Sequence, residues 1–496
     1  MNQDNDALLE ETDPKLPCIP TVYDNIDTQV SDIGNIDRYV DANRPKNTRQ
    51  IIAGFSASLS ALSAGLVLGW TSPILNDLVH GKYNNINIDD HQMGWIGSFV
   101  TLGAMTMCIP TGFICDLVGR KKALLLLLIP FALGWSLIVW AKNPIDLYFG
   151  RLITGMAVGA CCIATPLYNG EIAHKTLRGA LGSCFQLMIT IGIFVSYLVG
   201  KYFSPFQFTV FCALLPLIFG LTFAFQPESP THLIRRGQLE EAKKCLILLR
   251  GEHYNVDAEL LEIEGSVKED SEMTISFRNT FTKKSVWKAV LIAFALMFFQ
   301  QFCGINAVVM YSSDIIKSTG VNLDANTATI MIGAFQAVAT FCASVIIDKA
   351  GRKPLLTLSL SLVSLTALIL AAYLTLKAKC ASDSNLVRAV GFVPVGALCL
   401  FVVAFSLGLG PIPWMISSEI LSAEIRSLVS SMAGTFNWFL AFILTKFYLE
   451  LCRSVGEDTL FYAFSVFTLL GIIFIVFVVP ETRGKSVSEI QEELER

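Results

Sequence analysis

Long apolar stretches separated by short polar segments run through the chain from about residue 50 to residue 480. Each stretch has about 20 residues, the length that an α-helix needs to cross roughly 30 Å of hydrocarbon. The stretches form two sets of six, one on each side of a long polar segment at 227–284. The pattern therefore predicts twelve membrane-spanning helices, near 50–72, 93–115, 123–141, 147–168, 180–200, 206–226, 286–312, 326–347, 354–376, 389–415, 427–450 and 459–479.

Two matched sets of six helices predict an all-α membrane protein made of two pseudo-symmetric six-helix bundles. Between the bundles, Leu239, Ala242, Leu246 and Leu249 recur at helical spacing among charged residues, which predicts short amphipathic linker helices. The expected regions are a disordered tail at 1–49, a first bundle at 50–226, a linker at 227–284, a second bundle at 285–480 and a tail at 481–496.

The distribution of basic residues predicts which face of the protein is cytoplasmic. An even number of spans puts both termini on the same side. Lys and Arg in the short loops are nearly balanced between the faces, but the flanking segments are not. Their basic residues are Arg44, Lys46, Arg49, Arg235, Arg236, Lys283, Lys284, Lys288, Arg483 and Lys485. By the positive-inside rule, the face with the linker and both termini is cytoplasmic.

The composition excludes several function classes. Hydrophobic residues make up 53% and charged residues 16% of the chain, against roughly 25% charged in soluble domains. The net charge of −4 provides no basic surface for a nucleic acid. The 13 cysteines are scattered without a C-x-x-C pair, so we expect no metal site and no cofactor. No nucleophile elbow or His–carboxylate pair is evident in the sequence, so we do not expect an enzyme.

Two charged motifs occur once in each half, at the predicted cytoplasmic helix ends. One is Asp-x-x-Gly-Arg-Lys, and the other is a Glu followed seven residues later by an Arg. Membrane topology explains the basic residues but not the repeated acids. We therefore expect a latch of ion pairs that forms while the pore faces outward, so that Ala at Arg120 or Arg352 would favour the inward-facing state. The latch residues are Asp116, Arg120, Glu171, Arg178, Asp348, Arg352, Glu419 and Arg426.

Uncharged amides recur in the middle of the predicted spans: Gln186, Gln300, Gln301, Asn306, Gln336 and Asn437. An unpartnered amide in hydrocarbon costs several kcal/mol, so these side chains must face one another, water or a ligand. Contact between helices would explain one amide, but the whole set favours a site. Amides suit vicinal hydroxyls, and Trp414 with Phe405 offers apolar faces for a sugar ring, which predicts a neutral polyhydroxyl ligand. Glycine and proline at 304–306 and 408–413 predict broken helices there.

Many of these residues resemble the sugar-porter family of the major facilitator superfamily over about residues 50–490. The first-half motifs are Gly112-x-x-x-Asp116-x-x-Gly119-Arg120-Lys121, Gly150-Arg151, Pro166-x-Tyr168-x-x-Glu171, Arg178-Gly179, Gln186-Leu187 and Pro227-Glu228-Ser229-Pro230. The second-half motifs are Gln300-Gln301-x-x-Gly304-Ile305-Asn306, Asp348-x-x-Gly351-Arg352, Gly410-Pro411-Ile412-Pro413-Trp414, Asn437-Trp438 and Pro480-Glu481-Thr482-Arg483-Gly484. The segment 69–73 resembles the branch of animal facilitative glucose and insect trehalose transporters.

This resemblance implies the major facilitator fold and transport of a sugar. It implies sugar contacts for Gln186, Gln300, Gln301, Asn306, Gln336 and Trp414, to which we add Asn437. Proton-linked members carry an Asp at the position of Thr71, and the segment 51–72 contains no acid. We therefore predict uniport of a hexose, or of a disaccharide such as trehalose, by alternating access. The alternatives are a proton-coupled symporter and a non-transporting sugar sensor.

The N-terminal tail holds a short pattern, Asp4-x-x-x-Leu8-Leu9, that resembles an acidic dileucine sorting signal. A plain disordered tail would explain the same residues. If the signal is used, a sorting adaptor is a partner, besides the sugar and the surrounding lipid. We expect residence in the plasma membrane, with the endosomal or lysosomal membrane as the alternative.

Overall fold

The computed structural model describes residues 45–273, 284–321, 323–379, 390–485 and 487–495 as helices joined by turns and loops. Twelve helices in this part of the chain are long and apolar enough to cross a membrane, which confirms the predicted number and the all-α class. The tail pattern Asp4, Leu8 and Leu9 lies outside the described residues.

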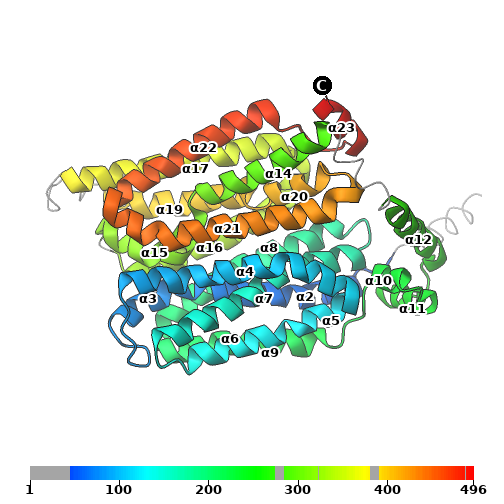
Figure 1. Ribbon diagram of the computed structural model, residues 1–496, viewed down its shortest axis with the longest axis horizontal. Helices are drawn as coiled ribbons and strands as arrows, with labels where there is room; N and C mark the ends of the chain where they lie inside the picture. The colour runs from blue at the N-terminus through cyan, green and yellow to red at the C-terminus, as the bar shows by residue number, and fades with distance from the viewer. Residues whose placement is uncertain (1–44, 274–283, 322, 380–389, 486, 496) are drawn as a thin grey trace, which may run out of the picture. The chain divides into compact units, whose positions relative to one another are not determined.

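The first six spans form one bundle (Figure 1). Capping boxes at Asp89/Gln92 and Asn143/Asp146 begin two of its long helices, because each side chain accepts the backbone N–H of the other residue. The helices are α2 (Thr48–Gly69) continued by α3 (Thr71–Val79), α4 (Asp90–Val118), α5 (Arg120–Leu126) continued by α6 (Leu128–Val139), α7 (Pro144–Ile172), α8 (Arg178–Tyr202) and α9 (Pro205–Phe223).

The other six spans form the second bundle, and two of them are interrupted. The seventh span breaks at Gly304, which adopts a left-handed conformation, and the tenth contains a π-helix at Phe405–Leu409. The helices are α14 (Lys284–Phe302) continued by α15 (Ile305–Thr319), α16 (Ala325–Ala350), α17 (Arg352–Lys379), α19 (Val393–Ala404) with the π-helix and α20 (Ile412–Glu419), α21 (Ala423–Val455) and α22 (Glu457–Val478).

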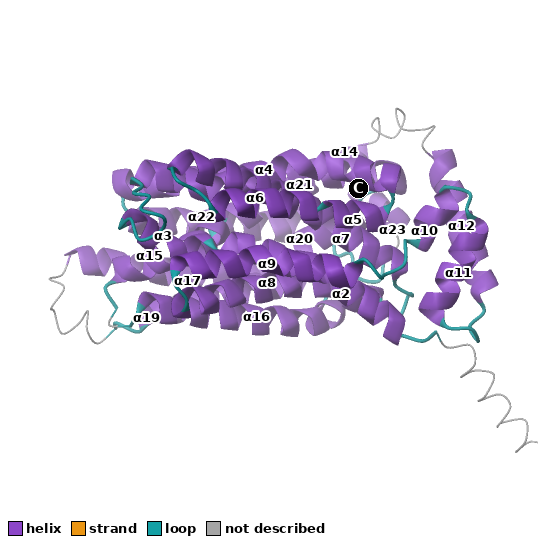
Figure 2. Ribbon diagram, turned by 90° about the horizontal axis from the view of Figure 1, so that it is seen from below, coloured by secondary structure: helices purple, strands orange, loops and turns teal. Residues whose placement is uncertain are grey.

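Short helices gather at one end of the bundles, which we call the linker face. They are α10 (Pro230–Arg235), α11 (Leu239–Arg250), α12 (Val256–Met273) and α23 (Val487–Glu495). Figures 1 and 2 show α10 to α12 beyond the ends of the long helices, which run side by side. Arg250 joins α11 to α12 by donating to Glu259 at 2.7 Å, and it attaches the linker to the first bundle by donating to the last carbonyl of α7, that of Ile172, at 2.8 Å.

Within the first bundle, α4 and α7 pack closely because small residues face each other. A side chain at Gly155 would overlap the backbone of Val100, and one at Gly159 would overlap Ala104. Close approach of this kind compensates for the missing hydrophobic driving force between helices in lipid. The packing makes the bundle a rigid support for side chains that project from α7.

The two bundles contact each other toward the end away from the linker, which we call the opposite face. Tyr197 of α8 donates to the carbonyl of Val309 at 2.6 Å, and the N–H of Ser313 donates to the hydroxyl of Ser72 at 3.2 Å. All four side chains are at most 6% exposed, so the bundles exclude water there. The described conformation is therefore closed at the opposite face.

Candidate functional site

Four of the mid-span amides form a continuous hydrogen-bonded chain, which we call the amide relay. Asn306 donates to Gln301 at 2.5 Å, and Gln301 donates to Asn437 at 2.8 Å. Asn437 then donates to Gln300 at 2.7 Å. The relay joins α14, α15 and α21, so all four of its amides belong to the second bundle.

The break in the tenth span anchors the relay. Gln300 donates both of its N–H groups, at 2.8 Å each, to the carbonyls of Leu409 and Gly410. The π-helix and the prolines that follow it leave these carbonyls without their usual helical partners. The helix break predicted from glycine and proline therefore supplies the acceptors that orient Gln300.

Three further residues of the expected site have exposed surface or polar atoms that make no hydrogen bond to the described residues. Gln186 of α8 and Trp414 of α20 are half-buried, and no hydrogen bond of the Gln186 amide is found among the described residues. Gln336 of α16 is 4% exposed, and its Oε1 has no partner in the described part of the chain. Asn306 is also half-buried. Because the bundles close above them, we infer that this surface opens toward the linker face.

A buried arginine that we did not include among the site residues lies in the first bundle, in contact with the residue next to Ser72. Arg151 of α7 is fully buried and donates to the carbonyl of Val67 at 2.7 Å and to the hydroxyl of Thr71 at 2.6 Å. Its guanidinium also lies 5.2 Å from the centre of the Trp70 ring. The hydrogen-bond partners of Arg151 are thus neutral groups, although a carboxylate in place of the Thr71 hydroxyl would pair strongly with it. The Gly-Arg dipeptide was the available sequence signal.

At the linker face of the first bundle, Arg120 is the centre of a cluster. Its guanidinium is 1% exposed and lies 2.9 Å from Glu171 and 3.0 Å from Asp116. Its Nη1 donates to Nδ1 of His232 at 2.9 Å. Burial lowers the pKa of His232, and the Arg120 charge acts in the same direction, so the imidazole accepts this bond in its neutral form. Ser229 also donates to Glu171.

The second bundle repeats this cluster. Arg352 lies 3.3 Å from Glu419, which accepts a hydrogen bond from Thr482 at 2.5 Å. In both copies a glycine with positive φ precedes the arginine, 97° at Gly119 and 88° at Gly351, because the chain must turn sharply between two helices. The side chain of Asp348 lies outside the described residues.

A third duplicated element, for which no role was predicted from the sequence, caps the helices after these glycines. Glu228 accepts the backbone N–H of Lys121 at 2.9 Å, and Glu481 accepts those of Arg352 and Lys353, each at 3.0 Å. A carboxylate there is favourable because it faces the positive end of a helix dipole. The repeated Pro-Glu dipeptide, followed by Ser in one copy and Thr in the other, was the available signal.

The two remaining latch candidates do not join these clusters through their expected carboxylates. Arg178 is exposed at the start of α8. Arg426 donates to the carbonyl of Leu421 at 3.1 Å instead. The arginines that pair with Glu171 and Glu419 are Arg120 and Arg352, and each of these pairs lies within one bundle. The clusters therefore brace helix ends inside each bundle, in a conformation that is closed at the opposite face.

A separate cavity of about 1400 Å³ lies between α16 and α19 and is lined by none of the relay residues. Its lining residues are mostly apolar, and some of them, such as Phe335 and Val338, are exposed on the second bundle. It therefore does not belong to the amide site.

Comparisons with known proteins agree with this arrangement. A family model described as "Sugar (and other) transporter" matches residues 50–494. The facilitated trehalose transporter Tret1 of Bombyx mori is 35% identical over 90% of this chain and 86% of its own. Tret1 of Polypedilum vanderplanki is 34% identical over 90% of this chain and 88% of its own.

Solved structures with the same fold include two of the bacterial transporter XylE. The proton:xylose symporter XylE bound to 6-bromo-6-deoxy-D-glucose superposes with a TM-score of 0.71 at 22% identity, covering 89% of this chain and 99% of that one. A partially occluded inward-open xylose transporter XylE from E. coli gives a TM-score of 0.73 at 20% identity, covering 88% and 100%. At these identities the likeness concerns the fold.

Proposed function

Because the chain belongs to the sugar transporter family, with the family model matching residues 50–494, we propose that it is a uniporter that carries its sugar by alternating access. The substrate is a hexose or a disaccharide such as trehalose, the sugar named for the Bombyx mori and Polypedilum vanderplanki relatives. Sugar moves down its gradient while the two bundles rock about it.

The amide relay with its unpartnered neighbours is the observation that carries this proposal. Asn306 uses one donor in the relay and keeps its carbonyl for a ligand, and Gln186 contributes a complete amide from the first bundle. The orphaned Oε1 of Gln336 adds an acceptor that a sugar hydroxyl would satisfy. Trp414 supplies an aromatic face for the sugar ring. Asn437, Gln300 and Gln301 hold Asn306 in place through the relay.

The surroundings of Arg151 support uniport over proton symport. Proton coupling needs a group that titrates as the sugar binds. The guanidinium of Arg151 meets the hydroxyl of Thr71 and backbone carbonyls, and the segment 51–72 contains no Asp or Glu. A threonine hydroxyl at that position does not ionise at physiological pH.

The linker face is cytoplasmic in this proposal, with both termini on that side, and the protein resides in the plasma membrane. Basic residues next to the described spans at this face, among them Arg235, Arg236 and Arg483, support the orientation. The two arginine–glutamate clusters then brace the cytoplasmic helix ends. A sorting adaptor that binds the dileucine pattern would set the amount of protein at the surface.

Flux in proteoliposomes tests the proposal directly. Purified full-length protein is reconstituted with a pH-sensitive dye in the lumen, and labelled glucose or trehalose is added outside. Uniport predicts saturable uptake that equilibrates the sugar without moving protons. Stoichiometric acidification of the lumen would establish symport instead, and sugar binding without uptake would establish a sensor.

Thr71→Asp provides a matched variant for the same assay. The introduced carboxylate would lie against the Arg151 guanidinium and restrain the site while it is ionised. We expect this variant to transport faster as the pH falls and the introduced carboxylate becomes protonated. The wild-type protein and Thr71→Ser should show no such rise. Equal pH profiles for all three would contradict the role given to this position.

A further inference from the structure

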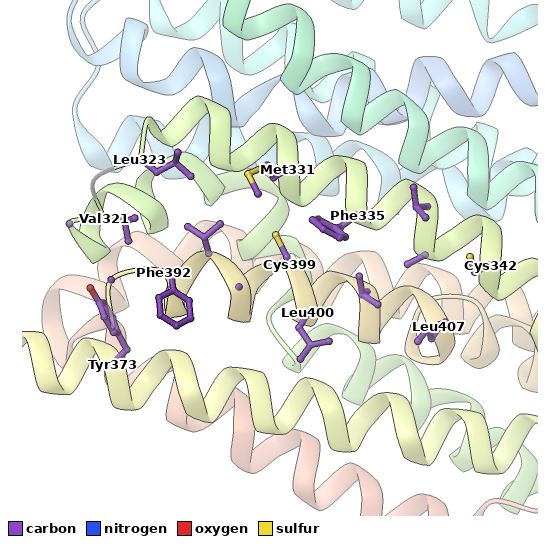
Figure 3. Close-up of a pocket in the computed structure, with 17 residues that line it drawn as sticks. Val321, Leu323, Met331, Phe335, Cys342, Tyr373, Phe392, Cys399, Leu400 and Leu407 are labelled. Atoms are coloured by element: carbon purple, nitrogen blue, oxygen red, sulfur yellow. The ribbon is translucent and has the colours of Figure 1, made fainter. Parts of the chain in front are cut away.

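A groove on the outer surface of the second bundle has a chemistry that sugar transport does not use. Its volume is about 1400 Å³, larger than the roughly 300–1000 Å³ typical of small-molecule pockets. Figure 3 shows side chains of α16 and α19 facing each other across it, with Tyr373 of α17 along one side. The lining includes Phe335, Cys399 and Leu407.

The groove lies among side chains that face the hydrocarbon. Phe335, within the span Ala325–Ile347, is 49% exposed, and Phe392, directly before the span Val393–Glu419, is 75% exposed. The lining residues recur every three to four positions along α16 and along α19, so each helix presents one apolar face. In a membrane, lipid chains cover such a surface.

The wall of the groove on α16 is about as long as one leaflet is thick. On α16 it extends from Met331 to Cys342, a difference of 342 − 331 = 11 residues, or about 16 Å at 1.5 Å per residue. A leaflet contributes about half of the roughly 30 Å hydrocarbon thickness. Gly320 and Val321 line the end at the opposite face, so the groove begins near that membrane surface.

A positive charge lies at this entrance. The ammonium group of Lys377 lies beside Gly320 and donates to the carbonyl of Ser318 at 2.6 Å. Within the described residues, no carboxylate forms an ion pair with it. A cation at the membrane surface attracts a lipid phosphate, whereas a sterol offers only a hydroxyl.

We propose that the groove binds one acyl chain of a phospholipid from the leaflet at the opposite face, with the phosphate held at Lys377. The chain lies between α16 and α19 and reaches Leu407 of the π-helix. The polar end stays in the interface, where the charge of Lys377 is accessible.

Gly396 allows the groove to be filled without disturbing the protein. It lines the groove, and a side chain at this position would meet open space. Gly396→Trp therefore occupies the space of the acyl chain, and Gly396→Leu occupies less of it. Leu214→Trp on α9 is the control, because Leu214 is 51% exposed and does not line the groove.

The test uses full-length protein in phosphatidylcholine nanodiscs that contain a phosphatidylcholine with a photoactivatable diazirine in its acyl chain. Adducts are mapped by mass spectrometry. We expect adducts concentrated on α16 and α19, a several-fold loss in Gly396→Trp, a smaller loss in Gly396→Leu and no change in Leu214→Trp. Equal labelling of α9 and α16 that Gly396→Trp does not change would overturn the proposal.

Lys377→Gln tests the phosphate contact. This variant should label several-fold less with the phosphatidylcholine probe and should label unchanged with a photoactivatable fatty alcohol that lacks a phosphate. Undiminished phosphatidylcholine labelling in Lys377→Gln would overturn the assignment of Lys377. Groove labelling by a photoactivatable sterol in preference to phosphatidylcholine would overturn the choice of lipid.

Discussion

The ammonium group of Lys446 lies 4.7 Å from the centre of the Trp95 ring, so that α21 of the second bundle meets α4 of the first. Lys446 is 4% exposed and also forms an ion pair with Glu450 at 2.7 Å. On the other side of the molecule, Lys201 of α8 lies 3.3 Å from Asp324, at the start of α16. Charged contacts therefore hold the bundles together at the opposite face.

Trp95→Leu should weaken this closure, because it removes the ring that the Lys446 charge faces. A desolvated cation–π contact is worth about 1–2 kcal/mol, enough to shift the balance between the two states several-fold. Trp95→Phe keeps a ring and should shift it less. The measurement is labelling of Ser313→Cys, now 2% exposed, by a membrane-impermeant maleimide. If Ser313→Cys were labelled equally with Trp95 present and with Trp95→Leu, the result would contradict this role.

Arg120→Ala should destabilise the protein more than Arg352→Ala. The Arg120 guanidinium is 1% exposed and faces two carboxylates, whereas that of Arg352 is 12% exposed. Removing one partner of a buried pair costs about 3–5 kcal/mol, and the cost falls toward about 1 kcal/mol with exposure to solvent. Thermal unfolding of the two variants in detergent measures the difference. The reverse order would show that burial does not determine the strength of these clusters.

The amide relay and Gln186 should separate stability from sugar binding. Asn437→Ala leaves the polar groups of Gln300 and Gln301 that bonded to Asn437 unsatisfied, at about 1–3 kcal/mol each, so both the unfolding temperature and the sugar affinity should fall.

Gln186→Ala removes no hydrogen bond found in the described structure. It should therefore weaken sugar binding, by about tenfold for a loss of 1.4 kcal/mol, at unchanged stability. Calorimetric binding and thermal unfolding test both; a Gln186→Ala protein with wild-type affinity would exclude Gln186 from the site.

His232 should make stability depend on pH. Burial lowers its pKa below the ordinary 6.5, so the unfolded chain takes up a proton at a higher pH than the folded protein does. Stability from this group is complete above about pH 6.5 and is lost as the pH falls from there toward the lowered pKa. Unfolding temperatures from about pH 7.5 to pH 5.5 should fall in the wild-type protein and fall less in His232→Gln. Parallel curves would show that His232 does not contribute.

The apolar stretches were sufficient to predict the spans and most of their ends to within a few residues, but the seventh span, expected near 286–312, continues to Thr319. The span expected near 93–115 is α4, Asp90–Val118. The break expected near 408–413 is the π-helix and the turn after it. Local sequence determines such features, because helix length and backbone breaks depend on neighbouring residues.

Pairing between distant residues could not be predicted in the same way. Glu171 and Arg178 are seven residues apart, a spacing that fits one helix face, but α7 ends at Ile172 and α8 begins at Arg178. The carboxylate therefore meets Arg120 on another helix. The partners of Asn437 likewise come from a helix more than a hundred residues earlier, and only the packing of the bundle brings them together.

The amide relay also determines whether the protein binds sugar equally well for inward and for outward transport. Asn306, Gln301, Asn437, Gln300 and the carbonyls that anchor them all belong to the second bundle. Rocking of the bundles leaves their mutual geometry unchanged, and only the contribution from Gln186 alters. A sugar therefore makes nearly the same contacts whether it binds from the outside or from the cytoplasmic side. The half-saturating sugar concentrations for entry and for exit should be similar.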